Sequence, residues 1–177
     1  MKIAITGASG LIGSALVPHL RARGDDVIRL VRRPATAPDE ASWDPNAGTV
    51  DLDALAGVEA VVHLAGAGVG NHRWSNDYKK LILDSWVNGT HTIVRAMTDL
   101  DLPPRALIAG SAIGWYGDTG DHAVDESAPA GTGFLADVVR AWEAAAEPAI
   151  AAGIRVVNAR TGLVVSAPDS TMGPLVS

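Results

Sequence analysis

Short apolar segments alternate along this chain with longer stretches in which apolar side chains recur every three or four residues. The short segments indicate buried strands and the longer ones indicate helices with one apolar face. Strands are predicted at residues 2–6, 26–31, 59–65, 105–109 and 154–159. Helices are predicted at residues 11–23, from a Ser75 N-cap to about residue 100, and at residues 134–152. Strands separated by helices pair in parallel through right-handed crossovers, so the pattern predicts an α/β, Rossmann-type doubly wound parallel sheet with helices on both faces.

The same periodicity predicts which helix positions face the sheet. The expected buried positions are Leu11, Ile12, Ala15, Leu16 and Leu20 in the first helix and Leu81, Ile82, Val87, Ile93, Val94 and Met97 in the long helix. Residues 34–48 are rich in Pro, Asp and Ala, which predicts a loop that carries Trp43, followed by a short segment at residues 49–55. Residues 66–70 read as a Gly-rich turn at the end of the third predicted strand.

A glycine-rich loop joins the first predicted strand to the first helix. Gly7, Gly10 and Gly13 stand at G-x-x-G-x-x-G spacing. Gly7 would allow a tight turn, Gly10 would let the backbone approach a pyrophosphate, and Gly13 would let helix and strand pack closely. Helix N-termini also offer free N–H groups to an anion. A purely structural turn is the alternative, but the strand–loop–helix–strand order favours a dinucleotide site. The residues predicted to contact the cofactor there are Gly7, Ser9, Gly10, Leu11, Ile12 and Gly13.

The end of the second predicted strand indicates which dinucleotide is bound. Sites that prefer NAD place an acidic residue there to bind the ribose 2′-hydroxyl, whereas this chain has Arg32 and Arg33. Guanidinium groups offer paired, charged donors to a 2′-phosphate. The alternative is that two arginines end a strand in solvent. The sequence favours NADP over NAD.

Composition narrows the class of protein. The 177 residues are 47% hydrophobic, which is enough for one globular domain. A net charge of −6 disfavours nucleic acid as a partner. Cysteine is absent, and the His and carboxylate residues show no metal-ligand spacing, so no metal is expected. No apolar run is long enough for a membrane span, and a cytoplasmic location with a small-molecule substrate is expected.

Several further motifs resemble one enzyme family. They are the Gly7-to-Gly13 loop, His63-Leu64-Ala65-Gly66, Val87-Asn88-Gly89-Thr90, Gly110-Ser111-Ala112 with Tyr116-Gly117-Asp118, and Arg160-Thr161-Gly162. Together they resemble the extended short-chain dehydrogenase/reductases, the family of sugar-nucleotide epimerases and dehydratases. Arg73-Trp74, the run from Ser111 to Gly117 and Ala141-Trp142-Glu143 resemble more narrowly an atypical, NADP-binding epimerase-like subgroup. The resemblance implies further cofactor contacts at Leu64, Ala65, Gly66, Trp86 and Leu163.

The chain departs from this family at its catalytic pair. The family uses a Tyr-x-x-x-Lys pair as acid/base and ribose holder, and the matching positions here are Leu135 and Val139. Ser111 matches the family's substrate-orienting serine, although a serine that caps a turn is the alternative. Tyr116 is a candidate replacement proton donor, and a packing role is the alternative. Ser111 and Tyr116 are therefore the predicted catalytic residues.

Two classes of function follow. The first is an NADP-dependent oxidoreductase or epimerase-like enzyme acting on a small polar, sugar- or nucleotide-linked substrate. The second is a non-catalytic module that senses NADP(H). The resemblance also implies a substrate lobe beyond residues 1–165, the cofactor domain, for which the 166–177 tail is too short. We therefore expect an open nicotinamide side and apolar surface near Trp86 and Trp115, which would favour a homo-oligomer or docking to another chain.

Overall fold

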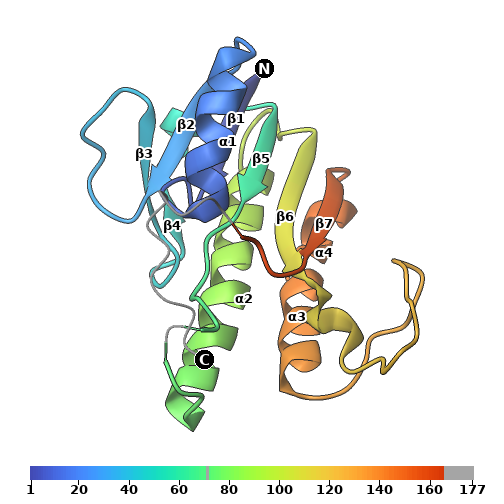
Figure 1. Cartoon of the computed structure of the whole chain (residues 1–177). Helices are drawn as coiled ribbons and strands as arrows, with labels where there is room; N and C mark the ends of the chain where they lie inside the picture. Colours follow the sequence, from blue (N-terminus) through green and yellow to red (C-terminus); the bar gives the residue numbers. More distant parts are fainter. Residues whose placement is uncertain (71, 166–177) are drawn as a thin grey trace.

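In the computed structural model, which describes residues 1–70 and 72–165, the chain forms a seven-stranded sheet in the order β4-β3-β2-β1-β5-β6-β7 (Figure 1). The strands are β1 (Lys2–Thr6), β2 (Asp26–Val31), β3 (Glu40–Asp44), β4 (Thr49–Val50), β5 (Ala60–His63), β6 (Ala106–Ala112) and β7 (Arg155–Thr161). The helices are α1 (Leu11–Ala22), α2 (Asn76–Thr98), α3 (Phe134–Ala144) and α4 (Glu147–Ala151), with 3-10 turns η1 (Asp53–Leu55) and η2 (Ile113–Tyr116).

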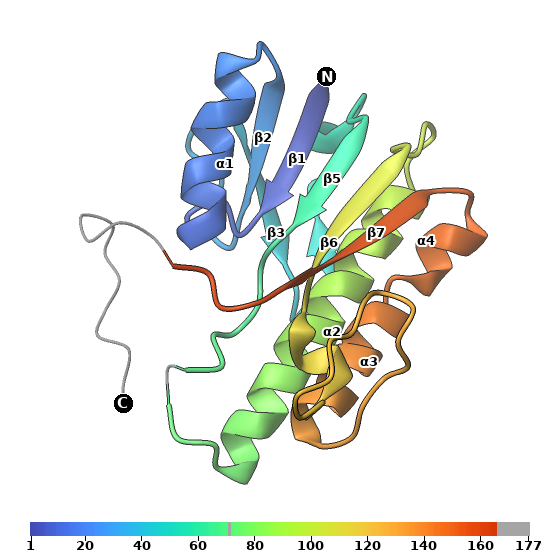
Figure 2. The same ribbon diagram turned by 45° about the vertical axis from the view of Figure 1, so that its right-hand side comes forward.

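Helices cover both faces of the sheet, with α1 on one face and α2 and α3 on the other (Figures 1 and 2). On the α1 face, Ile3 and Ile5 pack against Val17 and Leu20. The other face has a larger apolar cluster, made with residues of α2 and α4. Every strand pair is parallel except β3 with β4, which is antiparallel. The predicted doubly wound Rossmann-type fold is therefore confirmed.

The strand order reverses at β1, and this positions the site. From β1 the chain adds β2 and β3 on one side and then returns to add β5 on the other. Register pairs Thr6 with Leu30 of β2 and with His63 of β5, so these three strand ends lie at the same edge of the sheet. In open α/β sheets ligands bind at the carboxyl ends of strands where the order reverses.

The rotation of α1 differs from the prediction. Its buried residues are Gly13, Val17 and Leu20, whereas Ile12 is 38% exposed. The inward placement predicted for Ile12 and Ala15 is wrong, whereas Leu11 and Leu16 are half-buried. Gly13 lies so close to the preceding loop that a Cβ there would be 2.3 Å from the Gly7 carbonyl oxygen. Because of this contact, Gly13 faces the sheet, and so do Val17 and Leu20, which follow it at helical spacing. The first apolar pair of the helix, Leu11 and Ile12, does not.

The stretch from 34 to 48 also differs, because it contains β3 and not only a loop. Trp43 is 5% exposed and joins the core cluster. β3 pairs with β2 from Arg29–Glu40 onwards, a long-range contact that the local Pro and Asp content conceals. The short segment predicted at residues 49–55 appears as β4 and η1.

The long helices are largely as predicted. The Ser75 hydroxyl accepts the N–H of Tyr78 and caps α2. Leu81, predicted as buried, is 52% exposed. Trp86 is itself buried, with 8% of its surface exposed. The helix predicted at residues 134–152 is divided into α3 and α4, with Pro148 in the first turn of α4, a position that proline favours.

The residues that follow β7 run across the carboxyl end of the sheet (Figure 2). They lead towards the end of α1 that carries the glycine loop. The predicted tail, residues 166–177, lies outside the described residues. Within residues 1–70 and 72–165, no helix has the combination of length and apolar character needed to cross a bilayer.

Candidate functional site

The glycine loop has the shape that a pyrophosphate site needs. Gly7 has a φ of 68°, a left-handed conformation that favours glycine. The N–H of Gly10 donates to the Gly7 carbonyl at 3.0 Å and closes the turn. Gly10 is also the N-cap of α1 and supplies no side-chain cap, so the first N–H groups of the helix are available to an anion. The close approach of Gly13 to Gly7 leaves no room there for a side chain.

This loop borders a pocket of about 540 Å³ at the edge where β1, β2 and β5 end. The pocket is lined by Gly7, Ala8, Ser9, Gly10, Arg29, Leu30, Val31, Arg32, Arg33, Trp43, Leu64, Ala65 and Gly66. Eight predicted cofactor contacts are among them: Gly7, Ser9, Gly10, Arg32, Arg33, Leu64, Ala65 and Gly66. The structure thus brings the glycine loop, the arginine pair and the end of β5 together around one cavity.

The other predicted cofactor contacts do not line this pocket. Leu11 and Ile12 follow the loop at the start of α1, and Gly13 is buried behind it. Trp86 packs against Trp142 and donates its indole N–H to the Ala67 carbonyl at 2.9 Å. Leu163 follows β7 and is 76% exposed.

Thr6 and His63 support the floor of the pocket. The Thr6 hydroxyl oxygen accepts the N–H groups of Leu64 at 3.1 Å and Ala65 at 3.2 Å. It also lies 2.7 Å from Nδ1 of His63. Burial lowers the pKa of His63 to about 4, so the ring is neutral near pH 7. A neutral, fully buried imidazole and a threonine hydroxyl thus fix the backbone that lines the pocket.

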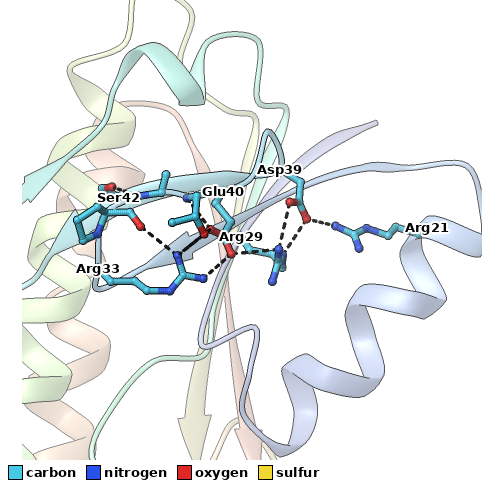
Figure 3. A network of polar contacts seen from close by, with 9 residues as sticks. Arg21, Arg29, Arg33, Asp39, Glu40 and Ser42 are labelled. Atoms are coloured by element: carbon cyan, nitrogen blue, oxygen red, sulfur yellow. Dashed lines mark hydrogen bonds and ion pairs between the residues drawn. The ribbon is translucent and has the colours of Figure 1, made fainter.

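Arg33, which follows β2, belongs to a charged network that also includes Arg29 of β2 (Figure 3). The Glu40 carboxylate accepts hydrogen bonds from Nη1 of Arg33 at 2.8 Å and from Nη2 at 2.7 Å. It also accepts a hydrogen bond from the backbone N–H of Thr36 at 3.0 Å. Asp39 accepts Nε of Arg29 at 2.8 Å and also pairs with Arg21. Hydrogen bonding to Arg33 lowers the pKa of Glu40 to about 2.

Arg32 and Arg33 therefore differ in their surroundings. The Glu40 carboxylate holds the Arg33 guanidinium against the turn that begins at Pro34. Arg32 is exposed and lines both the dinucleotide pocket and an adjoining hollow. The charged residues that line the dinucleotide pocket are Arg29, Arg32 and Arg33, whereas the adjoining hollow is also lined by Asp44 and Asp51. The lining of the dinucleotide pocket is therefore positively charged, which suits a phosphate.

A second polar cluster lies where β6 and β7 end against α3. We call Ser111, Tyr116, Glu143 and Arg160 the Glu143 cluster. The Ser111 hydroxyl donates to Oε1 of Glu143 at 2.5 Å, and Arg160 donates to both carboxylate oxygens at 2.8 and 2.9 Å. Nη1 of Arg160 donates to the Tyr116 phenol oxygen at 3.1 Å. Hydrogen bonding to Glu143 raises the pKa of Arg160, so its guanidinium remains charged.

The predicted catalytic residues Ser111 and Tyr116 thus belong to one network, through two residues that the sequence did not single out for chemistry. Glu143 and Arg160 lie on α3 and β7, and no local spacing links them. Val139, at the family's lysine position, is buried, and Leu135 lies beside Gly114. Across residues 1–70 and 72–165, no group of three His, Cys, Asp or Glu side chains could hold a metal ion.

Comparison with known proteins identifies the family. The family model described as the NAD dependent epimerase/dehydratase family matches residues 3–173. The chain belongs to this epimerase/dehydratase family. The epimerase family protein ML0860 of Mycobacterium leprae is 43% identical over 99% of this chain and 57% of its own length. The human epimerase family protein SDR39U1 is 30% identical over 99% of this chain and 59% of its own length.

Solved structures of epimerase-family proteins have the same fold. The nucleoside-diphosphate sugar epimerase of Corynebacterium glutamicum superposes with a TM-score of 0.82 at 37% identity, covering 94% of this chain and 34% of that one. Human SDR39U1 with NADPH gives a TM-score of 0.79 at 28% identity, covering 97% of this chain and 57% of that one. The chain spans about half the length of the curated relatives that it matches.

The pocket fits the family's cofactor. A Cβ at Gly7 would lie 2.7 Å from the Leu64 carbonyl carbon, so loop and strand end are packed as closely as a nucleotide cradle requires. The uncapped start of α1 and the surplus of arginine both suit a pyrophosphate-containing ligand. These observations agree with an NAD(P)-dependent member of the epimerase/dehydratase family.

Proposed function

We propose that this chain is the cofactor domain of an NADP(H)-dependent oxidoreductase or epimerase-like enzyme. The observation that carries the choice of NADP(H) is Arg32, an exposed guanidinium on the pocket lining where an NAD site has a carboxylate. The Glu40 carboxylate on the neighbouring β3 is already bound by Arg33 and Thr36. The human relative whose structure contains NADPH supports the same choice.

The residues of the pocket would divide the work of binding. The glycine loop and the start of α1 bind the pyrophosphate, Arg32 binds the 2′-phosphate, and the Leu64–Gly66 backbone lines the path towards the nicotinamide. When bound, the cofactor supplies or accepts a hydride, which is chemistry that no side chain here can perform. The chain's own part is to orient the dinucleotide and to supply a proton-transferring group at the ends of β6 and β7.

For the substrate we propose a small polar carbonyl or alcohol compound, of the sugar-nucleotide class. The support is that the protein MoeE5, 27% identical over 90% of this chain, has been solved with UDP-glucose and NAD. UDP-glucose and UDP-glucuronic acid are therefore the first compounds to test with NADPH or NADP⁺.

The cofactor assignment is tested by calorimetric titration with NADPH and NADH. We expect NADPH to bind at least about tenfold more tightly, a difference of about 1.4 kcal/mol. Arg32→Ala should remove most of this difference. Arg23→Ala is the matched control, because Arg23 also carries an exposed charge but pairs with Asp25 at the other end of α1. Equal affinities of the unaltered protein for both dinucleotides would refute the proposal.

A non-catalytic NADP(H) sensor is the second candidate. The observation that favours it is the apolar pair Leu135 and Val139 at the family's Tyr and Lys positions. Oxidation of NADPH, followed by its absorbance against a panel of aldehydes, ketones, quinones and keto-sugars, separates the two candidates. Turnover with any of these compounds that requires the intact glycine loop excludes the sensor.

A further inference from the structure

We propose that Tyr116 is the proton-transferring group of this protein and that Arg160, oriented by Glu143, is the cation that supports it. The inference rests on the proposed function, because a proton is needed only where a hydride is transferred. It assigns roles to two residues, Glu143 and Arg160, that lie outside the dinucleotide pocket.

The geometry around the phenol carries the proposal. Arg160 donates through Nη1 to the Tyr116 oxygen at 3.1 Å, and its guanidinium carbon lies 5.3 Å from the centre of the Tyr116 ring. A charged donor aimed at a phenol oxygen stabilises negative charge on that oxygen. Tyr116 accepts this bond, so its own hydrogen remains available for a substrate. Tyr116 is half-buried at the end of η2.

Arg160 has little freedom to move. Nε and Nη2 are bound by the two Glu143 oxygens, which leaves Nη1 pointing at Tyr116. Its side chain is 15% exposed and stacks on Trp115, with the guanidinium carbon 4.0 Å from the ring centre. A planar fork fixed on two sides in this way positions its remaining donor well.

Ser111 has a positioning role in this arrangement. It is 3% exposed, and its hydroxyl donates to Glu143 and not into open space. The Ser111–Glu143–Arg160 chain joins β6, α3 and β7 and ends at the phenol of Tyr116.

The proposed step balances as follows for reduction of a carbonyl compound. The hydride of the reduced nicotinamide forms the new C–H bond, and the electrons of the C=O double bond move to oxygen. That oxygen takes the Tyr116 proton and becomes a hydroxyl group. Tyr116 is left as a phenolate beside Arg160 and recovers its proton from water. Oxidation of an alcohol follows the same path in reverse.

The test uses the chemical reactivity of the phenol and needs no identified substrate. An aryl sulfonyl fluoride reacts with ionised phenols: the phenol oxygen displaces fluoride at sulfur and the proton leaves to solvent. The chain has two tyrosines, so mass spectrometry can follow each separately. Tyr78 is the internal control, because it is 8% exposed and donates its hydroxyl to the Gly68 carbonyl.

Two substitutions break the same ion pair but should have opposite effects. Arg160→Gln removes the positive charge next to the phenol, so we expect labelling of Tyr116 to slow on the order of tenfold. Glu143→Gln keeps one oxygen that accepts from Arg160, so the guanidinium stays oriented, but it removes the counter-charge. Labelling of Tyr116 should therefore become faster. Arg160→Lys keeps the charge but lacks the planar fork, so its rate should lie between those of the parent and Arg160→Gln. Labelling of Tyr78 should be unchanged in all three variants.

A merely structural ion pair would give a different result, since both Gln variants would loosen the same contacts and shift Tyr116 in the same direction. That outcome, or no change in either variant, overturns the proposal. If the Gln variants fail to fold, faster labelling of Tyr78 reveals it. The unaltered protein then decides: Tyr116 must react faster than N-acetyltyrosinamide at the same pH, and a slower reaction overturns the proposal. NADPH binding is measured separately, so failure here is distinct from failure of the cofactor assignment.

Discussion

His63 should make the folded protein sensitive to mild acid. Its side chain is fully buried, and Nδ1 lies 2.7 Å from the Thr6 hydroxyl oxygen. That oxygen already accepts two backbone N–H groups, so its hydrogen is directed to Nδ1 and the ring proton is assigned to Nε2. Protonating Nδ1 would place two hydrogens between the ring and the hydroxyl and bury a charge.

The size and sign of the effect follow from the pKa of His63, which burial lowers from 6.5 to about 4. Above pH 6.5 the ring is neutral in both states, and its contribution to stability is fully present. Between 6.5 and about 4 the unfolded chain binds a proton that the folded chain does not, so the free energy of unfolding falls as the pH falls. At about 1.4 kcal/mol per pH unit the whole loss is about 3 kcal/mol, and about 2 kcal/mol of it occurs by about pH 5.

Urea unfolding followed by tryptophan fluorescence between about pH 7.5 and 5 measures this loss. His63→Asn is the control, since Asn Oδ1 can replace Nδ1 as acceptor but does not titrate. The other four histidines are exposed, and Asp39 and Glu40, with pKa values of about 2, affect stability only at lower pH. We expect the pH dependence to be much smaller in His63→Asn. A parent protein equally stable at both ends of this range, or a variant with the same slope, would refute the reasoning.

Two further changes test the loop and the core. Gly13→Ala places a Cβ 2.3 Å from the Gly7 carbonyl oxygen, so the loop must move and NADPH affinity should fall at least about tenfold, whereas Gly70→Ala, which meets nothing within 4 Å, should bind normally. Unchanged affinity in Gly13→Ala would contradict the assigned loop. Trp142→Phe removes the buried N–H that donates to the Thr90 hydroxyl at 2.9 Å and should cost about 1–3 kcal/mol in urea unfolding. An unaltered midpoint would show that this bond does not contribute.

Local patterns predicted much of the fold. Each strand of the parallel core is a short apolar run between turn residues, and the glycine loop has a spacing with a direct steric meaning. The local sequence does not predict β3, because its strand character depends on pairing with β2. Residues 34–39, which precede β3, suggest a loop. The rotation of α1 was missed because a single close contact between Gly13 and Gly7 outweighs the apolar pattern.

The candidate sites too were predictable in part, and the remaining contacts depend on the folded chain. The pocket could be predicted because its parts follow strand ends, where parallel topology brings them together. The ion pair between Arg33 and Glu40 could not be predicted, because Glu40 lies beside Arg33 only once β3 has formed. Glu143 and Arg160 are 17 residues apart on different elements, and only the folded chain shows that they meet. Trp86 packs against Trp142, a contact between helices that no spacing reveals.

The central place of β1 in the sheet has a consequence for how the chain folds. β1 can pair with β2 as soon as a single helical connection has formed, but its other edge must wait for β5, which meets it through residues 57 positions apart. Non-local pairings of this kind slow folding, because loop entropy is lost before the contacts form. In the interval β1 exposes unpaired backbone groups and apolar side chains, a state prone to edge-to-edge aggregation. Slow or misdirected closure of β5 on β1 is therefore the step at which a chaperone would most improve the yield of folded protein.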